Sequence, residues 1–275
     1  MDKLSDIVRR FSISAGVFYS GQLCGVTSFE DHENRIGHIH LLKQGRLTLS
    51  EVRKETVVVE EPSLLFYPRP TSHRISADQY IQTEVVCATV RYGTGSANPL
   101  SNSLPRLLIM PLDRNPRLKQ TAEWLFEEAF TERNAKHIMM DRLAELLVIQ
   151  IVRHLLETDQ ANSGMLAGLS HPQLGQALNA MHDQPEKSWT LQELASLSTM
   201  SRSKFADLFQ KIVGNSAGDY LIEFRIEIAK NLLRQDKPVG LVANEVGYET
   251  ASALARVFRK KLGMSPMEWL QLESG

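Results

Sequence analysis

The stretches WTLQELASLSTMSRSKFADLFQKIVGNSAGDYLIEFRIEIAKNLL (residues 189–233) and VANEVGYETASALARVFRKKLGMSPMEW (residues 242–269) contain one pattern twice. In each copy a small residue precedes a short turn, and a hydroxyl residue then begins a second apolar helix. These residues are Ala195 and Ser201 in the first copy, and Ala243 and Thr250 in the second. A small residue lets two helices approach closely, and the hydroxyl group caps the first turn. The pattern predicts helix-turn-helix units at about residues 190–213 and 239–262.

The second helix of each unit has one apolar face. Its apolar residues recur at helical spacing, as Phe205, Leu208, Phe209 and Ile212 in the first unit and Leu254, Val257, Phe258 and Leu262 in the second. The turns differ in composition, because the second has Gly247 where the first has β-branched Thr199. Glycine suits a tight turn with positive φ. Either the first turn has another shape or it holds Thr199 in a strained conformation.

A continuous helix is predicted between the two units. Residues Ala217 to Arg234 contain no proline, and no glycine after Gly218. Such a helix is about 27 Å long at ~1.5 Å per residue. One turn of B-DNA is roughly 34 Å long. A rigid helix of this length can hold two recognition helices over successive major grooves on one face of a duplex.

These stretches resemble the DNA-binding region of the AraC/XylS family of bacterial regulators. From Gly247 to Pro266 the chain matches the family signature G-Y-x-[ST]-x-S-x-[FL]-x-R-x-F-[RK]-[RK]-x-x-G-x-[ST]-P. Three positions depart from the family, since Leu254 replaces an aromatic residue, Thr199 a glycine and Leu270 a basic residue. The departures affect local stability and one backbone contact. The resemblance implies a sequence-specific DNA-binding transcription regulator, with RNA polymerase as a further partner.

The helix faces opposite the apolar stripes are expected to contact double-stranded promoter DNA. The candidates are Arg202, Ser203, Lys204, Ala206, Asp207 and Gln210 on the first recognition helix, and Ser252, Ala255, Arg256, Arg259 and Lys260 on the second. We expect Ser203, Asp207 and Gln210 to contact base edges, with Asp207 accepting from a cytosine amino group. Arg256 could read a guanine, contact a phosphate or pair within the domain. The alternative for each charged residue is a solvated helix face, and for the whole motif a helical bundle that binds no DNA.

Composition permits two domains in a chain of 275 residues with a formal net charge of -1. Charges are also nearly balanced from Glu186 to Gly275, so DNA binding depends on basic residues gathered on one face. We expect modest nonspecific affinity and reliance on a partner or a dimer. Cys24 and Cys87 form neither a disulfide framework nor a zinc-site spacing. No signal sequence and no membrane-spanning run is apparent. We expect a cytoplasmic protein that does not associate with membranes.

The N-terminal half has the pattern of an antiparallel β-sandwich or barrel. Short runs of strand-forming residues lie at 17–19, 22–26, 36–42, 46–52, 56–59, 64–67 and 83–90. Turn residues separate them, as at Gly21 and Gly45. The segments GHIHLLKQGRLTL (residues 37–49) and PSLLFYPRPTSHRIS (residues 62–76) resemble the two halves of a cupin barrel, in the version that serves some AraC-type regulators as the domain that binds a small-molecule effector.

Four polar residues of this barrel correspond to the ligands of metal-holding cupins, namely His38, His40, Gln44 and His73. Alternation along a strand places residues 38 and 40 on one face. Imidazole nitrogens bind zinc, iron or nickel, but Gln44 replaces the usual acidic ligand. We therefore favour hydrogen-bonded groups in or near an effector cavity over a metal site, and we expect no cofactor.

The predicted fold class is α+β. A cupin-like antiparallel β-barrel with two following helices occupies residues 1–158, a linker 159–170, and an all-α domain 171–275. The two helices begin at Asn115-Pro116 and at Lys136, and the second, ending at Glu157, is apolar enough to cover the barrel and to pair with its copy in a homodimer. Residues 93–105 have the composition of a loop.

Enzyme motifs do not support catalysis. The chain lacks a nucleophile elbow, a P-loop, a dinucleotide fingerprint and a zinc-protease helix. The alternative function is a cupin oxygenase or isomerase that uses His38, His40 and His73, with the helices as a protein-interaction module. We favour a regulator in which a small molecule in the barrel changes the dimer or releases the C-terminal domain.

Overall fold

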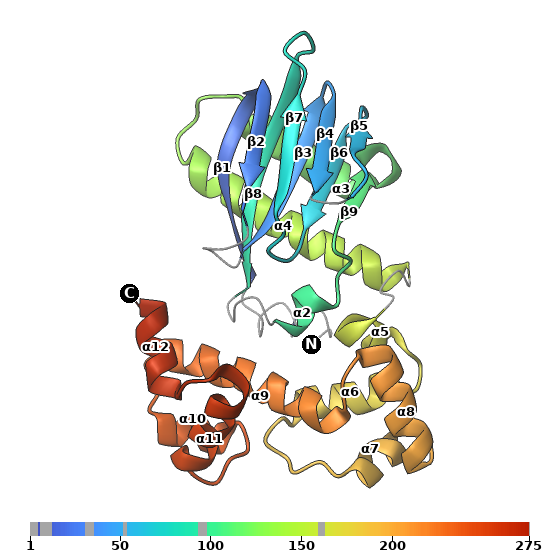
Figure 1. Cartoon of the computed structure of the whole chain (residues 1–275), viewed down its shortest axis with the longest axis vertical. Helices are drawn as coiled ribbons and strands as arrows, with labels where there is room; N and C mark the ends of the chain where they lie inside the picture. The colour runs from blue at the N-terminus through green and yellow to red at the C-terminus, as the bar shows by residue number, and fades with distance from the viewer. Residues whose placement is uncertain are drawn as a thin grey trace. The chain divides into compact units, whose positions relative to one another are not determined.

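The computed structural model describes residues 5, 13–30, 36–51, 54–92, 98–158 and 163–274 (Figure 1). The chain divides into two compact units. The sheet unit comprises Ser12–Ala97 and Pro105–Glu157. The helical unit comprises Met1–Phe11, Asn98–Leu104 and Thr158–Gly275.

Two antiparallel sheets form the body of the sheet unit, as the sequence predicts for a cupin-like domain. The five-stranded sheet has the order β1 (Ile13–Leu23), β8 (Thr83–Tyr92), β3 (Gly37–Gln44), β6 (Ser63–Tyr67) and β9 (Leu108–Pro111). The four-stranded sheet has the order β2 (Gly25–Phe29), β7 (His73–Ala77), β4 (Leu47–Glu51) and β5 (Val57–Val59). Buried residues from both sheets form one core, which includes Leu42, Leu47, Leu65, Ile75 and Val85.

Several details of the strands differ from the sequence prediction. Strand β1 continues through Gly21, which we expected to separate two strands. Strands β7 and β9 were not predicted. Their sequences, HRISA and LIMP, are short and lie beside prolines, so neither has a long alternating pattern. Pairing with β4 and β6 forms these strands, since an isolated segment of this length is not stable.

Two helices cover the five-stranded sheet, with the bounds that the sequence predicts. After the short helix η1 (Leu112–Arg114), α3 occupies Pro116–Ala129 and α4 occupies Lys136–Glu157. Helix α4 contacts β1, and Asp141 Oδ1 accepts a hydrogen bond from the Val17 amide at 2.8 Å. Helix α3 packs on α4, where Gln150 Nε2 donates to Thr121 Oγ1 at 2.9 Å. The expectation that α4 covers the barrel is confirmed.

The expected loop and linker each contain a helix. Helix α2 (Pro99–Asn102) is capped by the Asn98 side chain and buries Leu100. Helix α5 (Gly164–Ser170) buries Met165 and Leu166 and packs against α2. The small polar residues around these few apolar ones concealed both helices. Residues 93–97 and 159–162 of the two predicted segments lie outside the described residues.

The rest of the helical unit is a chain of helices around α9 (Ala217–Arg234), the unbroken helix that the sequence predicts. The others are α6 (Leu174–Asp183), α7 (Leu191–Leu197), α8 (Arg202–Val213), α10 (Val239–Glu245), α11 (Ala251–Leu262) and α12 (Pro266–Ser274). Figure 1 shows α9 between the pair α7 and α8 and the pair α10 and α11. Within the described residues no helix is both long and apolar enough to cross a membrane.

Candidate DNA-binding surface and histidine cluster

Helix α8 presents its polar face to solvent. Ser201 caps it, with its hydroxyl accepting from the Lys204 amide, and Phe205 and Phe209 are fully buried beneath it. All the candidate residues of this helix lie on the outer side, where Ala206 is half-buried and the rest are exposed: Arg202, Ser203, Lys204, Asp207 and Gln210. Gln210 Nε2 also donates to the Gly214 carbonyl at 3.0 Å, at the end of the helix.

Helix α11 repeats this arrangement in the second unit. The Thr250 hydroxyl accepts from the Ala253 amide, and Leu254 and Phe258 are completely buried. Leu254 therefore fills a core position beneath α11. The candidates Ser252, Arg256, Arg259 and Lys260 are exposed, and Ala255 is half-buried. Arg256 forms no ion pair with any described residue, so its guanidinium faces solvent.

Lys261 differs from the basic residues beside it. It directly follows Arg259 and Lys260 in the sequence, but its ammonium pairs with Asp219 Oδ1 at 3.1 Å and Glu223 Oε1 at 3.0 Å on α9. The pKa of Asp219 is lowered by the Ser216 hydroxyl, which caps α9, and then by Lys261. Lys261 thus joins α11 to α9 and is not part of the exposed basic group.

The two turns have the same backbone conformation. The φ angles of Thr199 and Gly247 are +53° and +83°, both left-handed. Their hydrogen bonds also match: Met200 N donates to Ala195 O at 2.9 Å, as Tyr248 N donates to Ala243 O at 2.8 Å. The second of the two alternatives is therefore correct, and Thr199 carries the strain of a β-branched residue in a conformation that suits glycine.

A buried arginine that the sequence analysis missed connects the two helix-turn-helix units. Arg225 on α9 donates from Nε to Pro185 O at 2.6 Å and from Nη2 to Lys187 O at 2.9 Å. Its guanidinium also lies 5.4 Å from the Tyr248 ring centroid. The segment before the first unit and the turn of the second are thus fixed to one side chain of the connecting helix. Its position in the sequence, beside the apolar stripe of α9, was the signal that could have predicted its burial.

Three histidines meet inside the sheet unit. His38, His40 and His73 are all buried, and Phe29 packs against each ring. The ring centroid of His40 lies 5.1 Å from that of His73, and the ring centroid of His38 lies 5.4 Å from that of His73. Alternation along the strand allowed residues 38 and 40 to share one face, and the structure brings both of them together with His73.

The hydrogen bonds of this cluster determine where its protons lie. His73 Nδ1 lies 2.7 Å from Thr71 O, a pure acceptor, so Nδ1 carries the proton and Nε2 accepts. His40 Nε2, at 2.8 Å, must then donate to His73 Nε2. This leaves His40 Nδ1 to accept from the Cys87 thiol at 3.2 Å. The order of donation is therefore Cys87 to His40 to His73 to the backbone.

Burial keeps every member of this network neutral. It lowers the pKa of His38 to about 4, that of His40 well below its ordinary value and that of His73 as well. It raises the pKa of the Cys87 thiol to about 12. Neutral rings and a protonated thiol are what the assigned order of donation requires.

These residues do not fit a bound metal. Two nitrogens on one tetrahedral zinc, each at about 2.0–2.1 Å, lie roughly 3.3 Å apart, whereas the His40 and His73 nitrogens are 2.8 Å apart and share a proton. Gln44 is exposed and about 13 Å along β3 from His40, at ~3.3 Å per residue. The described residues contain no group of three or more His, Cys, Asp or Glu that could hold a metal.

Comparison with known proteins agrees with both units. A model of the Cupin family matches residues 2–157, and a helix-turn-helix domain model matches residues 194–272. A putative AraC-like transcription regulator of Streptomyces lividans is 34% identical over 65% of this chain and 60% of its own length. The RCS-specific transcriptional activator RclR of Escherichia coli K12 is 27% identical over 84% of this chain and 82% of its own. The crystal structure of ToxT from Vibrio cholerae O395 is 11% identical, with a TM-score of 0.41 over 96% of this chain and 99% of its own.

Two helix-turn-helix units on one connecting helix, with polar outer faces, define the C-terminal part as a helix-turn-helix domain of the two-unit class. The chain belongs to the cupin family through its N-terminal part, and the two parts together have the domain composition of AraC-type transcriptional regulators. The chain spans less than two thirds of the length of the Streptomyces relative.

Proposed function

We propose that this chain is a sequence-specific transcription regulator that places α8 and α11 in successive major grooves of promoter DNA. The observation that carries the proposal is the unbroken helix α9 with a capped, outward-facing recognition helix at each end. Its 18 residues correspond to about 27 Å, somewhat less than one turn of DNA. Lys261 fixes the second helix-turn-helix unit to this helix, and Arg225 fixes the segment before the first unit to it.

The exposed side chains divide into two roles. We assign Ser203 and Asp207 to base edges, because they occupy the first two turns of α8, where recognition helices approach the groove floor. Gln210 follows on the same face at helical spacing, and we assign it to a base edge as well. Arg202, Lys204, Arg259 and Lys260 reach phosphates. Small side chains at Ala206, Ser252 and Ala255 let the backbone approach the bases, and the unpaired Arg256 reads a guanine.

A mobility-shift titration on the DNA upstream of the chain's own gene tests this proposal. Arg256→Ala should weaken binding by about 1–3 kcal/mol, or roughly 5- to 150-fold. Arg133→Ala, an exposed arginine of the sheet unit that pairs with Glu127, is the matched control and should bind like the wild type. Absence of any binding by the wild type, or equal loss in both variants, would contradict the proposal.

We further propose a homodimer through the sheet unit. Ile138 and Met139 on α4 and Trp124 on α3 are each about half exposed. We take these side chains of neighbouring helices as the centre of the interface, because a contiguous exposed apolar patch marks an interaction site. Sedimentation should give a dimer that Ile138→Glu dissociates, while a wild-type monomer persisting at micromolar concentration would contradict it.

Regulation requires a small molecule that binds one arrangement of the dimer or of the two units more tightly than another. We propose that the sheet unit binds this effector, and that RNA polymerase is a further partner at the promoter, in the cytoplasm. The histidines that a cupin oxygenase or isomerase would use bind one another instead. The regulator is therefore the better supported function.

A further inference from the structure

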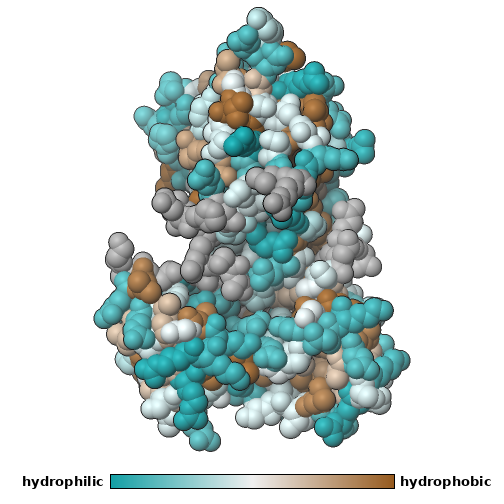
Figure 2. Space-filling model, viewed as in Figure 1, coloured by the Kyte–Doolittle hydropathy of each residue, from teal (hydrophilic) through white to brown (hydrophobic). Residues whose placement is uncertain are grey.

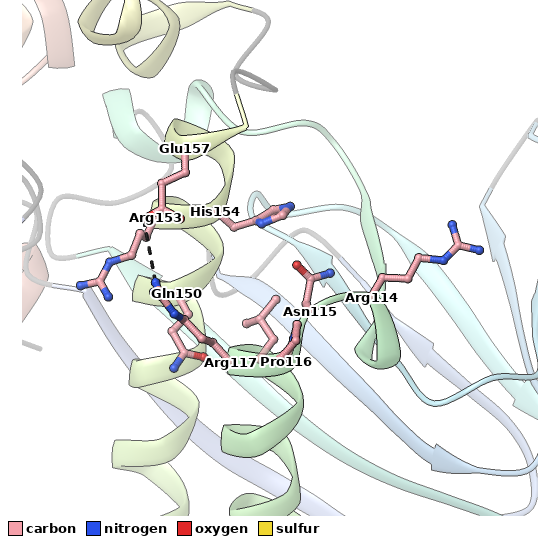
Figure 3. Close-up of a pocket in the computed structure, with 9 residues that line it drawn as sticks. Arg114, Asn115, Pro116, Arg117, Gln150, Arg153, His154 and Glu157 are labelled. Atoms are coloured by element: carbon pink, nitrogen blue, oxygen red, sulfur yellow. Dashed lines mark ion pairs between the residues drawn. The ribbon is translucent and has the colours of Figure 1, made fainter.

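A cavity of about 350 Å³ lies in the sheet unit, away from the histidine cluster. It lies between the start of α3 and the last two turns of α4 and is partly open to solvent (Figure 3). Its size is at the lower end of the ~300–1,000 Å³ that small-molecule sites occupy. The residues that matter for its chemistry are Arg114, Arg117, Leu118, Gln150, Arg153 and Glu157.

The charge around this cavity is predominantly positive. It has three arginines and a single carboxylate, and Figure 3 shows Arg114 on the side opposite Arg117 and Arg153. The carboxylate of Glu157 is 4.0 Å from the Arg117 guanidinium, the outer limit of an ion pair. Arg114 and Arg153 pair with no carboxylate among the described residues. Figure 3 shows both side chains extended outward at opposite edges of the pocket, so each guanidinium must turn inward to contact an anion.

The start of α3 adds to this positive field. The helix has 14 residues with Pro116 at its first position, and no acidic residue lies in its first turn. The side chain of Asn115 makes no capping hydrogen bond. The amide groups of the first turn carry partial positive charge and suit an anionic group.

One buried polar atom facing this region has no partner. Gln150 lines the cavity, and its Nε2 donates to Thr121, while its Oε1 is buried and accepts no hydrogen bond. A buried oxygen without a donor is unfavourable. A ligand hydroxyl or N–H group would supply the missing hydrogen bond. The apolar floor, formed by the 2% exposed Leu118, accommodates a short carbon frame.

We propose that this cavity binds a small organic anion, a carboxylate or a phosphate that also bears a hydrogen-bond donor, and that this anion is the effector. The effector role rests on the proposed function. Glu157 is the last residue of α4 and of the sheet unit, and Thr158 begins the return to the helical unit. A bound anion competes with Glu157 for Arg117, and so changes the last turn of α4 where the chain leaves the unit.

Binding is measured by calorimetry on the full chain with two probes, glycerate and glycerol 3-phosphate, which share a hydroxylated three-carbon frame. A preference for one probe identifies the anionic group. Arg153→Gln and Gln150→Leu should each raise the dissociation constant 5-fold or more. The control Arg142→Gln, on the outer face of the same helix and paired with Glu145, should leave it unchanged. No heat of binding for either probe at millimolar concentration, or equal loss in the control, would overturn the site.

The effector role is tested by repeating the promoter titration with saturating probe. We expect DNA affinity to change at least 3-fold, and Arg153→Gln to abolish the change. A probe that binds but leaves DNA affinity unaltered would overturn the effector role. If the wild-type chain binds the probes and the two pocket variants lose this binding, but no promoter DNA is bound, the anion site stands and the proposed function fails.

Discussion

Replacing Thr199 with glycine and Gly247 with alanine should change stability in opposite directions, because both turns have the same left-handed backbone. The conformation costs an L-residue about 1–2 kcal/mol. Glycine loses about 0.5–1 kcal/mol more than alanine in chain entropy on folding. Thr199 is exposed, so little packing is lost with its side chain. Thr199→Gly should therefore raise the free energy of unfolding by roughly 0.5–1 kcal/mol.

The reverse change at Gly247 adds a steric overlap. A Cβ at this position would lie 2.4 Å from the Glu186 carbonyl oxygen and 2.8 Å from Arg225 Nη2. Glu186 O belongs to the backbone, so the chain must shift, at about 1–3 kcal/mol for overpacking. With the conformational cost, and after the chain-entropy gain of replacing a glycine, Gly247→Ala should lower the free energy of unfolding by about 1–4.5 kcal/mol.

Urea unfolding measures both effects in a Trp124→Phe background, where fluorescence comes from Trp189 and Trp269 of the helical unit alone. If Thr199→Gly lowers stability by 1 kcal/mol or more, the first turn is not strained as described. If Gly247→Ala is neutral, the second turn does not pack against Glu186. Either result would refute the argument from the shared conformation.

Further predictions concern the contacts within each unit. Arg225→Met removes two charge-assisted hydrogen bonds, worth about 1.5–3 kcal/mol each. In fluorescence anisotropy this variant should lose more affinity for an operator with both half-sites than for a single half-site. An equal loss of affinity for both would contradict a role of Arg225 in holding the two helix-turn-helix units together. Lys260→Ala should lower the slope of log binding constant against log salt concentration by about one unit. Lys261→Ala should leave this slope unchanged and lower the melting temperature, because Lys261 pairs with Asp219. A change of slope in Lys261→Ala and none in Lys260→Ala would show that Lys261 contacts phosphate. Asp207→Asn should alter the preferred base at one operator position by about 1–3 kcal/mol in a selection from randomised DNA, and an unchanged preference would exclude base contact. The sheet unit should melt at a lower temperature as the pH falls from about 6.5 toward 4, because the unfolded histidines bind protons that the buried His38, His40 and His73 do not; an unchanged Trp124 melting curve between pH 7.5 and 5 would contradict their burial as neutral rings.

Local signals in the sequence were sufficient for the recognition helices. Ser201 and Thr250 cap α8 and α11, and the buried residues of both follow the predicted stripe, because capping and helical periodicity are short-range properties. The bounds of α4 and α9 were predictable for the same reason. Short segments that need a partner were not, and α2, α5, β7 and β9 are all of this kind.

Site chemistry was less predictable than site position. The spacing of His38 and His40 indicated convergence, but only coordinates show that His40 donates to His73 and leaves no pair of free nitrogens for a metal. Lys261 and Lys260 are adjacent and identical in type, yet only Lys261 faces the carboxylates of α9. Figure 2 shows a largely hydrophilic surface on the visible face of the helical unit. On such a surface, residue type alone does not distinguish a lysine that is available to DNA from one that pairs within the domain.

Hydroxyl-radical footprinting of the wild-type chain on its own promoter tests most directly whether both recognition helices engage one duplex. The structure predicts two protected patches on the same face of the DNA, about one helical turn or ~10 base pairs apart, with Arg256→Ala reducing only the patch under α11. A single protected patch, or two patches on opposite faces of the duplex, would contradict it.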